Sequence, residues 1–201
     1  MEMDRIRILV AEDHDIFRKG ICSLIEKVPD MEIVGEAADG EDAVRKADEL
    51  KPDIVIMDVM LPGMNGIEAT KAINEKVLDT KIITLSLHSD REYIVGMLKA
   101  GSSGYLLKDS AFQELVEAIR KVKEDRIFLG ETLIRTIAKD LLDLLGRVRM
   151  TQILTASERD VLRCLIEGKK TAEIASVLSV PPDAVERDRD NIINKWLMLF
   201  R

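Results

Sequence analysis

Three carboxylates follow two apolar runs of the sequence, at positions where they could take part in one reaction. Asp58 ends the run 53–58 and precedes a loop that contains Pro62 and Gly66, whereas Glu12 and Asp13 follow the run 6–11. Open α/β sheets place their binding and reaction sites at the carboxyl ends of the strands. If both runs are neighbouring strands, the three carboxylates meet at one edge of a sheet.

A cluster of three carboxylates repels itself unless a cation binds it. Oxygen ligands without a nearby cysteine or a pair of histidines favour a hard ion such as Mg²⁺. Shielded in this way, Asp58 is a candidate nucleophile toward a phosphoryl group, because aspartyl phosphates are known covalent intermediates. The alternative is that each acid only caps the end of a strand.

Two further polar groups end apolar runs and favour the functional interpretation. The run 81–86 ends in Ser86, and the run 104–108 ends in Lys108. A hydroxyl and an ammonium are the partners that a phosphoryl group needs on the side away from the metal. The sequence therefore predicts one site that is built from the ends of four strands.

Residues 4–124 resemble the receiver domain of bacterial two-component response regulators. The matching residues are Glu12, Asp13, Asp58, Pro62, Gly66, Ser86, Tyr105 and Lys108. The resemblance implies that Asp58 accepts a phosphoryl group from the phosphohistidine of a sensor histidine kinase. It also implies that Mg²⁺ is bound by Asp13, Asp58, the Met60 carbonyl and, through water, Glu12.

The resemblance further implies a switch and a subfamily. Ser86 and Tyr105 would reorient together on phosphorylation and move the face formed by the fourth helix, fifth strand and fifth helix. Lys108 is followed by Asp109, as is usual in the NarL/FixJ branch. Haloacid-dehalogenase-type phosphatases need a second Asp two residues after the nucleophile, where this chain has Met60. We expect a phosphoacceptor regulator rather than an enzyme, with at most self-phosphorylation from small phosphodonors and autodephosphorylation.

The pattern of apolar runs predicts three regions. Strands are expected near 6–11, 31–37, 53–58, 81–86 and 104–108, with helices near 15–28, 41–50, 66–76, 90–100 and 110–124. This alternation predicts an α/β, flavodoxin-like receiver over residues 1–124, with a five-stranded parallel sheet. A helical linker is expected over 125–152. Its apolar residues have helical spacing, which does not decide whether it packs on its own receiver or forms a dimer contact.

Residues 153–201 resemble the small, all-α, LuxR-type helix-turn-helix domain of NarL/FixJ regulators, in a truncated or atypical form. The matching residues are Leu154, Thr155, Glu158, Val161, Leu162, Glu167, Gly168, Glu173, Ile174, Ala175, Leu178, Val180, Val185, Asn191 and Ile192. Most of them are scaffold: Thr155 is expected to cap a helix and Gly168 to end one. The apolar residues Trp196 and Phe200 are either part of the core or an exposed patch.

The residues that contact DNA in this family are not retained. Where the family has lysines, a hydroxyl and a histidine, this chain has Ala172, Asp183, Ala184, Glu186 and Asp188. Each lost base contact removes on the order of 1–3 kcal/mol of discrimination, and acids near the groove repel phosphates. The remaining candidate DNA contacts are Lys169, Lys170, Arg187, Arg189 and Lys195. Residues 151–201 contain eight basic and eight acidic side chains, so this region is not basic.

Two hypotheses for the output therefore stay open. Phosphorylation controls transcription through DNA binding, with a possible homodimer on phosphorylation, or the output domain has lost DNA binding and engages a protein. The 201 residues have a net charge of −7, and neither a membrane span nor a signal peptide is expected, which favours a cytoplasmic protein. Cys22 and Cys164 have no metal-ligand spacing and are expected to be packing residues.

Overall fold

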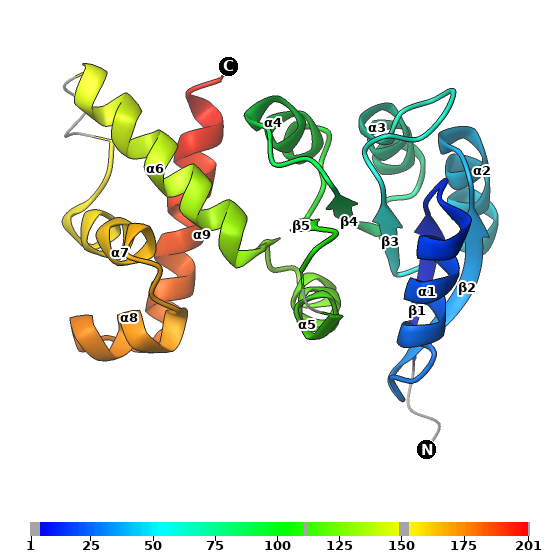
Figure 1. Cartoon of the computed structure of the whole chain (residues 1–201), viewed down its shortest axis with the longest axis horizontal. Coiled ribbons are helices and arrows are strands. Elements are labelled where there is room, and N and C mark those ends of the chain that lie inside the picture. Colours follow the sequence, from blue (N-terminus) through cyan, green and yellow to red (C-terminus); the bar gives the residue numbers. More distant parts are fainter. Residues whose placement is uncertain (1–4, 111, 149–152, 201) are drawn as a thin grey trace. The chain divides into compact units, whose positions relative to one another are not determined.

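The computed structural model describes residues 5–110, 112–148 and 153–200, and the contacts within the chain divide it into two compact units, Met1–Gly130 and Glu131–Arg201. The first unit contains a parallel sheet with the strand order β2-β1-β3-β4-β5-β6 (Figure 1). The strands are β1 (Ile6–Ala11), β2 (Met31–Ala37), β3 (Ile54–Met57), β4 (Lys81–Ser86), β5 (Gly104–Leu107) and β6 (Phe128–Leu129). The predicted α/β class is confirmed.

The sheet has six strands, so the predicted number of five is wrong. The additional strand, β6, lies in the segment that the sequence assigned to the linker, and it pairs in parallel with β5. It comprises only Phe128 and Leu129, and two residues are too few to show the alternation by which a strand is recognised.

Helices cover both faces of this sheet. They are α1 (Asp15–Ile25), α2 (Gly40–Leu50), α3 (Gly66–Lys76), α4 (Arg91–Lys99) and α5 (Phe112–Lys123). Figure 1 shows α1 and α5 on one face and α2, α3 and α4 on the other. All four residues of β3 are buried, as expected for a strand that is covered on both sides.

The register of the parallel strands brings the predicted site residues together. Ala11 of β1 is opposite Met57 of β3, so the acids that follow these two residues leave the sheet side by side. On the next pair of strands, Ser86 is opposite Leu107. The order of the strands changes direction between β1 and β3, which is where open α/β sheets form their sites.

The second unit consists of α6 (Glu131–Val148), α7 (Ala156–Ile166), α8 (Thr171–Leu178) and α9 (Pro182–Met198). Helix α6 contacts α7 and α9, so the helix expected in the linker packs on the helix-turn-helix. The side chain of Trp196 is only 1% exposed, and its indole N–H donates to the Asp140 carboxylate of α6 at 2.7 Å. Trp196 is therefore a core residue rather than part of an exposed patch.

Local signals fix the ends of these helices. Thr155 accepts a hydrogen bond from the Glu158 backbone and forms a capping box with it. Gly168 has φ of +81°, a conformation that favours glycine.

Cys22 and Cys164 are buried free thiols, as expected for packing residues. Among the described residues, no helix has the length and apolarity needed to cross a membrane.

Candidate functional site

Two buried carboxylates and one ammonium form the centre of the site. Glu12 and Asp58 are 3% and 4% exposed. Lys108, which follows β5, places its Nζ 2.6 Å from Glu12 Oε2 and 2.8 Å from Asp58 Oδ2. Asp13 lies on the exposed side of this group. The three predicted strand ends thus converge within hydrogen-bonding distance.

Lys108 is the internal counter-cation of this cluster. Burial alone would lower the pKa of Lys108, but hydrogen bonds from its ammonium to Asp58 and Glu12 outweigh burial and raise it. The ammonium also lies 4.9 Å from the centre of the Phe17 ring, within the range of a cation–π contact. Three carboxylates and one ammonium leave two net negative charges, which a divalent cation would neutralise.

Two residues beside the acidic pair were not predicted from the sequence. Arg18 is 9% exposed; its Nη1 donates to the Glu12 carbonyl at 2.5 Å and its Nε to Glu36 at 3.1 Å. His14 places its Nδ1 2.9 Å from Asp13 Oδ1 and 3.1 Å from Glu12 Oε1. For His14 the only signal in the sequence is its position directly after the two acids. Arg18 is one charged residue in a helix, and its spacing does not distinguish it from a solvated residue.

The loop after Asp58 is held close to that residue. A Cβ on Gly66 would lie 2.0 Å from the Asp58 backbone oxygen, so only glycine fits there. Asn65 caps α3 and forms a capping box with Glu68. The backbone N–H of Met60 lies 3.4 Å from Asp58 Oδ1, and the side chain of Met60 is exposed. The loop therefore brings backbone groups to the carboxylate of Asp58.

Ser86 and Tyr105 both contact the loop after β4. Ser86 Oγ accepts a hydrogen bond from the His88 backbone N–H at 3.1 Å, and the Tyr105 hydroxyl donates to the His88 carbonyl at 2.8 Å. Both side chains are fully buried. Burial raises the pKa of Tyr105 to about 12, so the phenol remains protonated and can donate. A movement of this loop would have to break both bonds.

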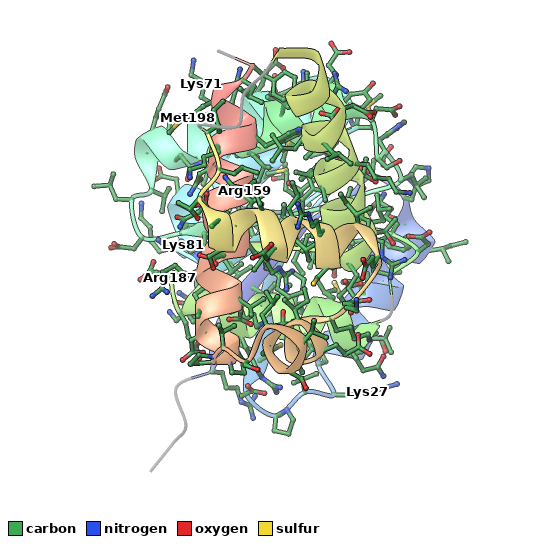
Figure 2. The ribbon with its side chains drawn as sticks, turned by 90° about the vertical axis from the view of Figure 1, so that its left-hand side faces the viewer. Lys27, Lys71, Lys81, Arg159, Arg187 and Met198 are labelled. Carbon is green, nitrogen blue, oxygen red and sulfur yellow. The ribbon has the colours of Figure 1, made fainter. Side chains whose placement is uncertain are left out.

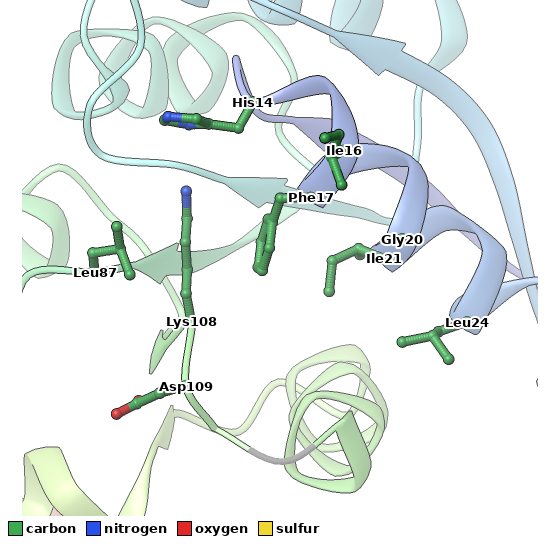
Figure 3. A pocket seen from close by; sticks show the side chains of 9 residues that line it. All are labelled: His14, Ile16, Phe17, Gly20, Ile21, Leu24, Leu87, Lys108 and Asp109. Atoms are coloured by element: carbon green, nitrogen blue, oxygen red, sulfur yellow. The ribbon is translucent and has the colours of Figure 1, made fainter.

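An apolar groove lies next to the ammonium of Lys108. It has a volume of about 610 Å³. Figure 3 shows Phe17, Ile21 and Leu24 of α1 along one side, with Leu87 and Lys108 opposite. Ile16 and Leu87 are 90% and 72% exposed. Large exposed apolar side chains around a polar site are typical of a surface that binds another protein.

Most of the candidate DNA contacts already have partners within the second unit. Lys195 pairs with the buried Glu158 at 2.5 Å, Arg189 donates to Thr171 at 2.6 Å, Lys170 pairs with Glu131 at 3.2 Å and Lys169 pairs with Glu167. Arg187, on the N-terminal half of α9, is exposed and forms no ion pair with any residue that the structure describes (Figure 2). Of the five candidates, Arg187 alone is unengaged among the described residues.

The acids on α9 differ in their positions. Asp183 is exposed, as expected, whereas Asp188 is 9% exposed and accepts a hydrogen bond from Ser157 of α7. Asp188 is therefore not on an exposed face, and its expected weakening of DNA binding stays a prediction. Its carboxylate binds α9 to α7, a role that its helical position alone does not reveal.

Comparisons with known proteins agree with this architecture. Residues 8–120 match the response regulator receiver domain, and residues 152–196 match the bacterial regulatory proteins of the luxR family. The chain is 35% identical to the transcriptional regulatory protein LiaR of Bacillus subtilis over 190 residues, covering 94% of this chain and 90% of LiaR. It is 33% identical to the nitrate/nitrite response regulator NarL of Escherichia coli over 195 residues, covering 96% and 90%.

A solved structure shows the same relationship. A LuxR-family two-component response regulator from Aurantimonas sp. SI85-9A1 is 37% identical, with a TM-score of 0.66, over 69% of this chain and 99% of that one. The chain therefore belongs to the two-component response regulators that join a receiver domain to a LuxR-type helix-turn-helix domain and regulate transcription.

Proposed function

We propose that Asp58 accepts a phosphoryl group from the phosphohistidine of a sensor histidine kinase. A carboxylate oxygen of Asp58 attacks phosphorus and forms an acyl phosphate, while the phosphorus–nitrogen bond breaks and its electron pair remains on the histidine imidazole, which takes up a proton. The observation that supports this proposal is the convergence of Glu12, Asp58 and Lys108 at the ends of β1, β3 and β5.

The donor set fits Mg²⁺. The oxygens of Glu12, Asp13, Asp58 and the Met60 carbonyl are hard ligands of the kind that this ion prefers. Together with Lys108 the carboxylates leave two negative charges, so a divalent ion balances the site whereas a monovalent ion does not. When bound, the cation would neutralise oxygens of the transferred group and hold them in place.

Lys108, Ser86 and Tyr105 act on the side away from the cation. In the proposed reaction the Lys108 ammonium turns from Asp58 Oδ2 to an oxygen of the incoming group, and the Ser86 hydroxyl donates to another. Ser86 would then have to leave the His88 N–H, which it now contacts. Because Tyr105 donates to the carbonyl of the same residue, we propose that the change at Ser86 reaches the surface through this loop.

The groove along α1 supports a protein as the phosphodonor. Its exposed apolar residues lie beside Lys108 (Figure 3). The ammonium of Lys108 contacts Asp58. We propose that a helical donor packs against Ile16, Phe17 and Leu24 and presents its phosphohistidine to the carboxylate of Asp58. A small phosphodonor needs no such surface, so substitutions here should affect the kinase reaction more than the small-molecule reaction.

The experiment is labelling with a radioactive small acyl phosphate in the presence of Mg²⁺. Wild type is expected to take up a label that hydroxylamine removes, and Asp58→Asn is expected to take up none. Asp53→Asn is the matched control, because Asp53 lies at the opposite end of β3 and pairs with Lys123. Undiminished labelling of Asp58→Asn would show that another residue accepts the phosphoryl group.

For the output we propose weak DNA binding at most, with a protein contact as the second candidate. The scaffold matches the luxR family, which favours DNA. The bonds of Lys195 to the buried Glu158 and of Arg189 to Thr171 leave fewer cations for DNA phosphates, which favours a protein. Homodimer formation on phosphorylation stays a prediction.

A further inference from the structure

We propose that His14 is an additional ligand of the cation in this site, and that its imidazole makes the site favour a first-row transition ion such as Mn²⁺ over Mg²⁺. The inference rests on the proposed function, since it concerns the same cation. It adds a nitrogen ligand to a donor set that otherwise consists of oxygens.

The first observation is the distance between the donor atoms. One donor atom from each of Glu12, Asp13, His14 and Asp58 lies within 4.8 Å of all the others. His14 Nδ1 is 2.9 Å from Asp13 Oδ1 and 3.1 Å from Glu12 Oε1. Neighbouring ligands of an octahedral ion with bonds of about 2.1 Å are separated by about 3.0 Å. The imidazole thus already lies at the distance of an adjacent ligand.

The second observation is the direction of the ring. His14 is the N-cap residue of α1, but its side chain makes no capping hydrogen bond. Its backbone carbonyl accepts from the Arg18 N–H, which fixes the main chain at the start of the helix. The ring instead turns back toward Glu12 and Asp13 and stays largely exposed. Figure 3 shows it at the same end of the groove as the Lys108 ammonium.

The chemistry of the donor predicts selectivity. Imidazole is a good ligand for transition ions, whereas Mg²⁺ prefers oxygen and keeps water in its remaining positions. Loss of His14 should therefore weaken Mn²⁺ binding much more than Mg²⁺ binding. The alternative is that His14 only forms ion pairs with the acids, in which case its removal should change the affinity for both ions to a similar extent.

Electron spin echo measurements on Mn²⁺-loaded full-length protein, prepared without a histidine tag, test this directly. The chain has only two histidines, so the source of any nitrogen modulation can be assigned. Wild type and His88→Phe are expected to show modulation from a coordinated imidazole nitrogen, and His14→Phe is expected to show none. Absence of the signal from wild type, or its persistence in His14→Phe, would overturn the proposal.

Calorimetric titration of the same proteins at one fixed pH gives the second readout. His14→Phe is expected to raise the Kd for Mn²⁺ about tenfold or more, as for other substitutions that disturb metal ligation, while the Kd for Mg²⁺ changes far less. Equal losses for both ions would contradict a nitrogen ligand. Labelling of wild type by the acyl phosphate in Mg²⁺ tests the phosphoacceptor separately, so failure of one proposal can be distinguished from failure of the other.

Discussion

We predict that DNA binding by this protein weakens with salt concentration less steeply than its five candidate cations would suggest. Each phosphate that a protein neutralises contributes about −0.9 to the slope of log Kobs against log salt concentration. Five free cations would give a slope of about −4.5. The structure reduces this number, because Lys195 is paired with Glu158, whose side chain is only 3% exposed, and Arg189 donates to Thr171.

The ion pairs of Lys169 and Lys170 are more exposed than that of Lys195. Their partners Glu167 and Glu131 are exposed, and exposed ion pairs are worth only about 0–1 kcal/mol, so phosphates can replace them. Together with Arg187 they leave one to three cations, which predicts a slope between about −1 and −3.

Fluorescence anisotropy across a salt series, with labelled genomic fragments and protein activated by a phosphoryl mimic, measures this slope. Arg187→Gln should make it shallower by about 0.9. Lys169→Gln is the comparison for a cation that must first leave a carboxylate, and it should have a smaller effect. A slope of about −4 or steeper, or nanomolar binding to a defined site at physiological salt, would refute the argument that these pairs persist.

Three further predictions concern stability. Gly66→Ala places a Cβ 2.0 Å from a backbone oxygen, so it should destabilise the receiver by about 1–3 kcal/mol or more and reduce phosphorylation. Gly20→Ala is the control, because the space at its Cβ is open, and it should stabilise the receiver by about 0.5–1 kcal/mol. Thermal melts followed by circular dichroism measure both changes in stability. Burial raises the pKa of Glu158, but hydrogen bonds from Lys195 and Thr155 lower it by more, so its folded-state pKa lies below the ordinary value of 4.5. The second unit should therefore lose this stabilisation as the pH falls from 4.5 through the lower folded-state pKa. Glu158→Gln should abolish that part of the pH dependence. Lys195→Met leaves the buried carboxylate of Glu158 unpaired and should lower the free energy of unfolding by about 3–5 kcal/mol. The single tryptophan lies in this unit, so its fluorescence reports unfolding of both the Glu158→Gln and the Lys195→Met variants. An unaltered unfolding midpoint would contradict these two predictions.

The positions of the central site residues were predictable from the sequence because they depend on the backbone. Asp58 and Lys108 follow strands of a parallel sheet, and the register of such strands brings their carboxyl ends to one edge whatever the side chains are. The same reasoning applies to Ser86. A two-residue strand such as β6 has no comparable signal, since it is recognised only by its hydrogen bonds to β5.

Side-chain contacts between distant segments were not predictable. The spacing of apolar residues identifies a helical face over α6 but does not name the surface that covers it, and the pairing of Trp196 with Asp140 joins residues 56 positions apart. Asp188 looked like an acid on a DNA-facing helix because its partner, Ser157, lies on another helix. Which cations are free is a property of the folded domain, not of its charge count.

The ion pair between Lys195 and Glu158 gives Lys195 a structural role within the second unit, distinct from a role in DNA binding. Glu158 belongs to the capping box that begins α7 and also binds Lys195 near the end of α9. A lysine held by a buried, capping carboxylate stabilises the packing of α7 on α9, and it can reach a phosphate only by leaving that carboxylate uncompensated, at a cost of about 3–5 kcal/mol. This cost exceeds the 1–3 kcal/mol of a good base contact. The presence of Lys195 on α9 is therefore accounted for by the packing of α7 on α9, and it does not by itself indicate a DNA contact.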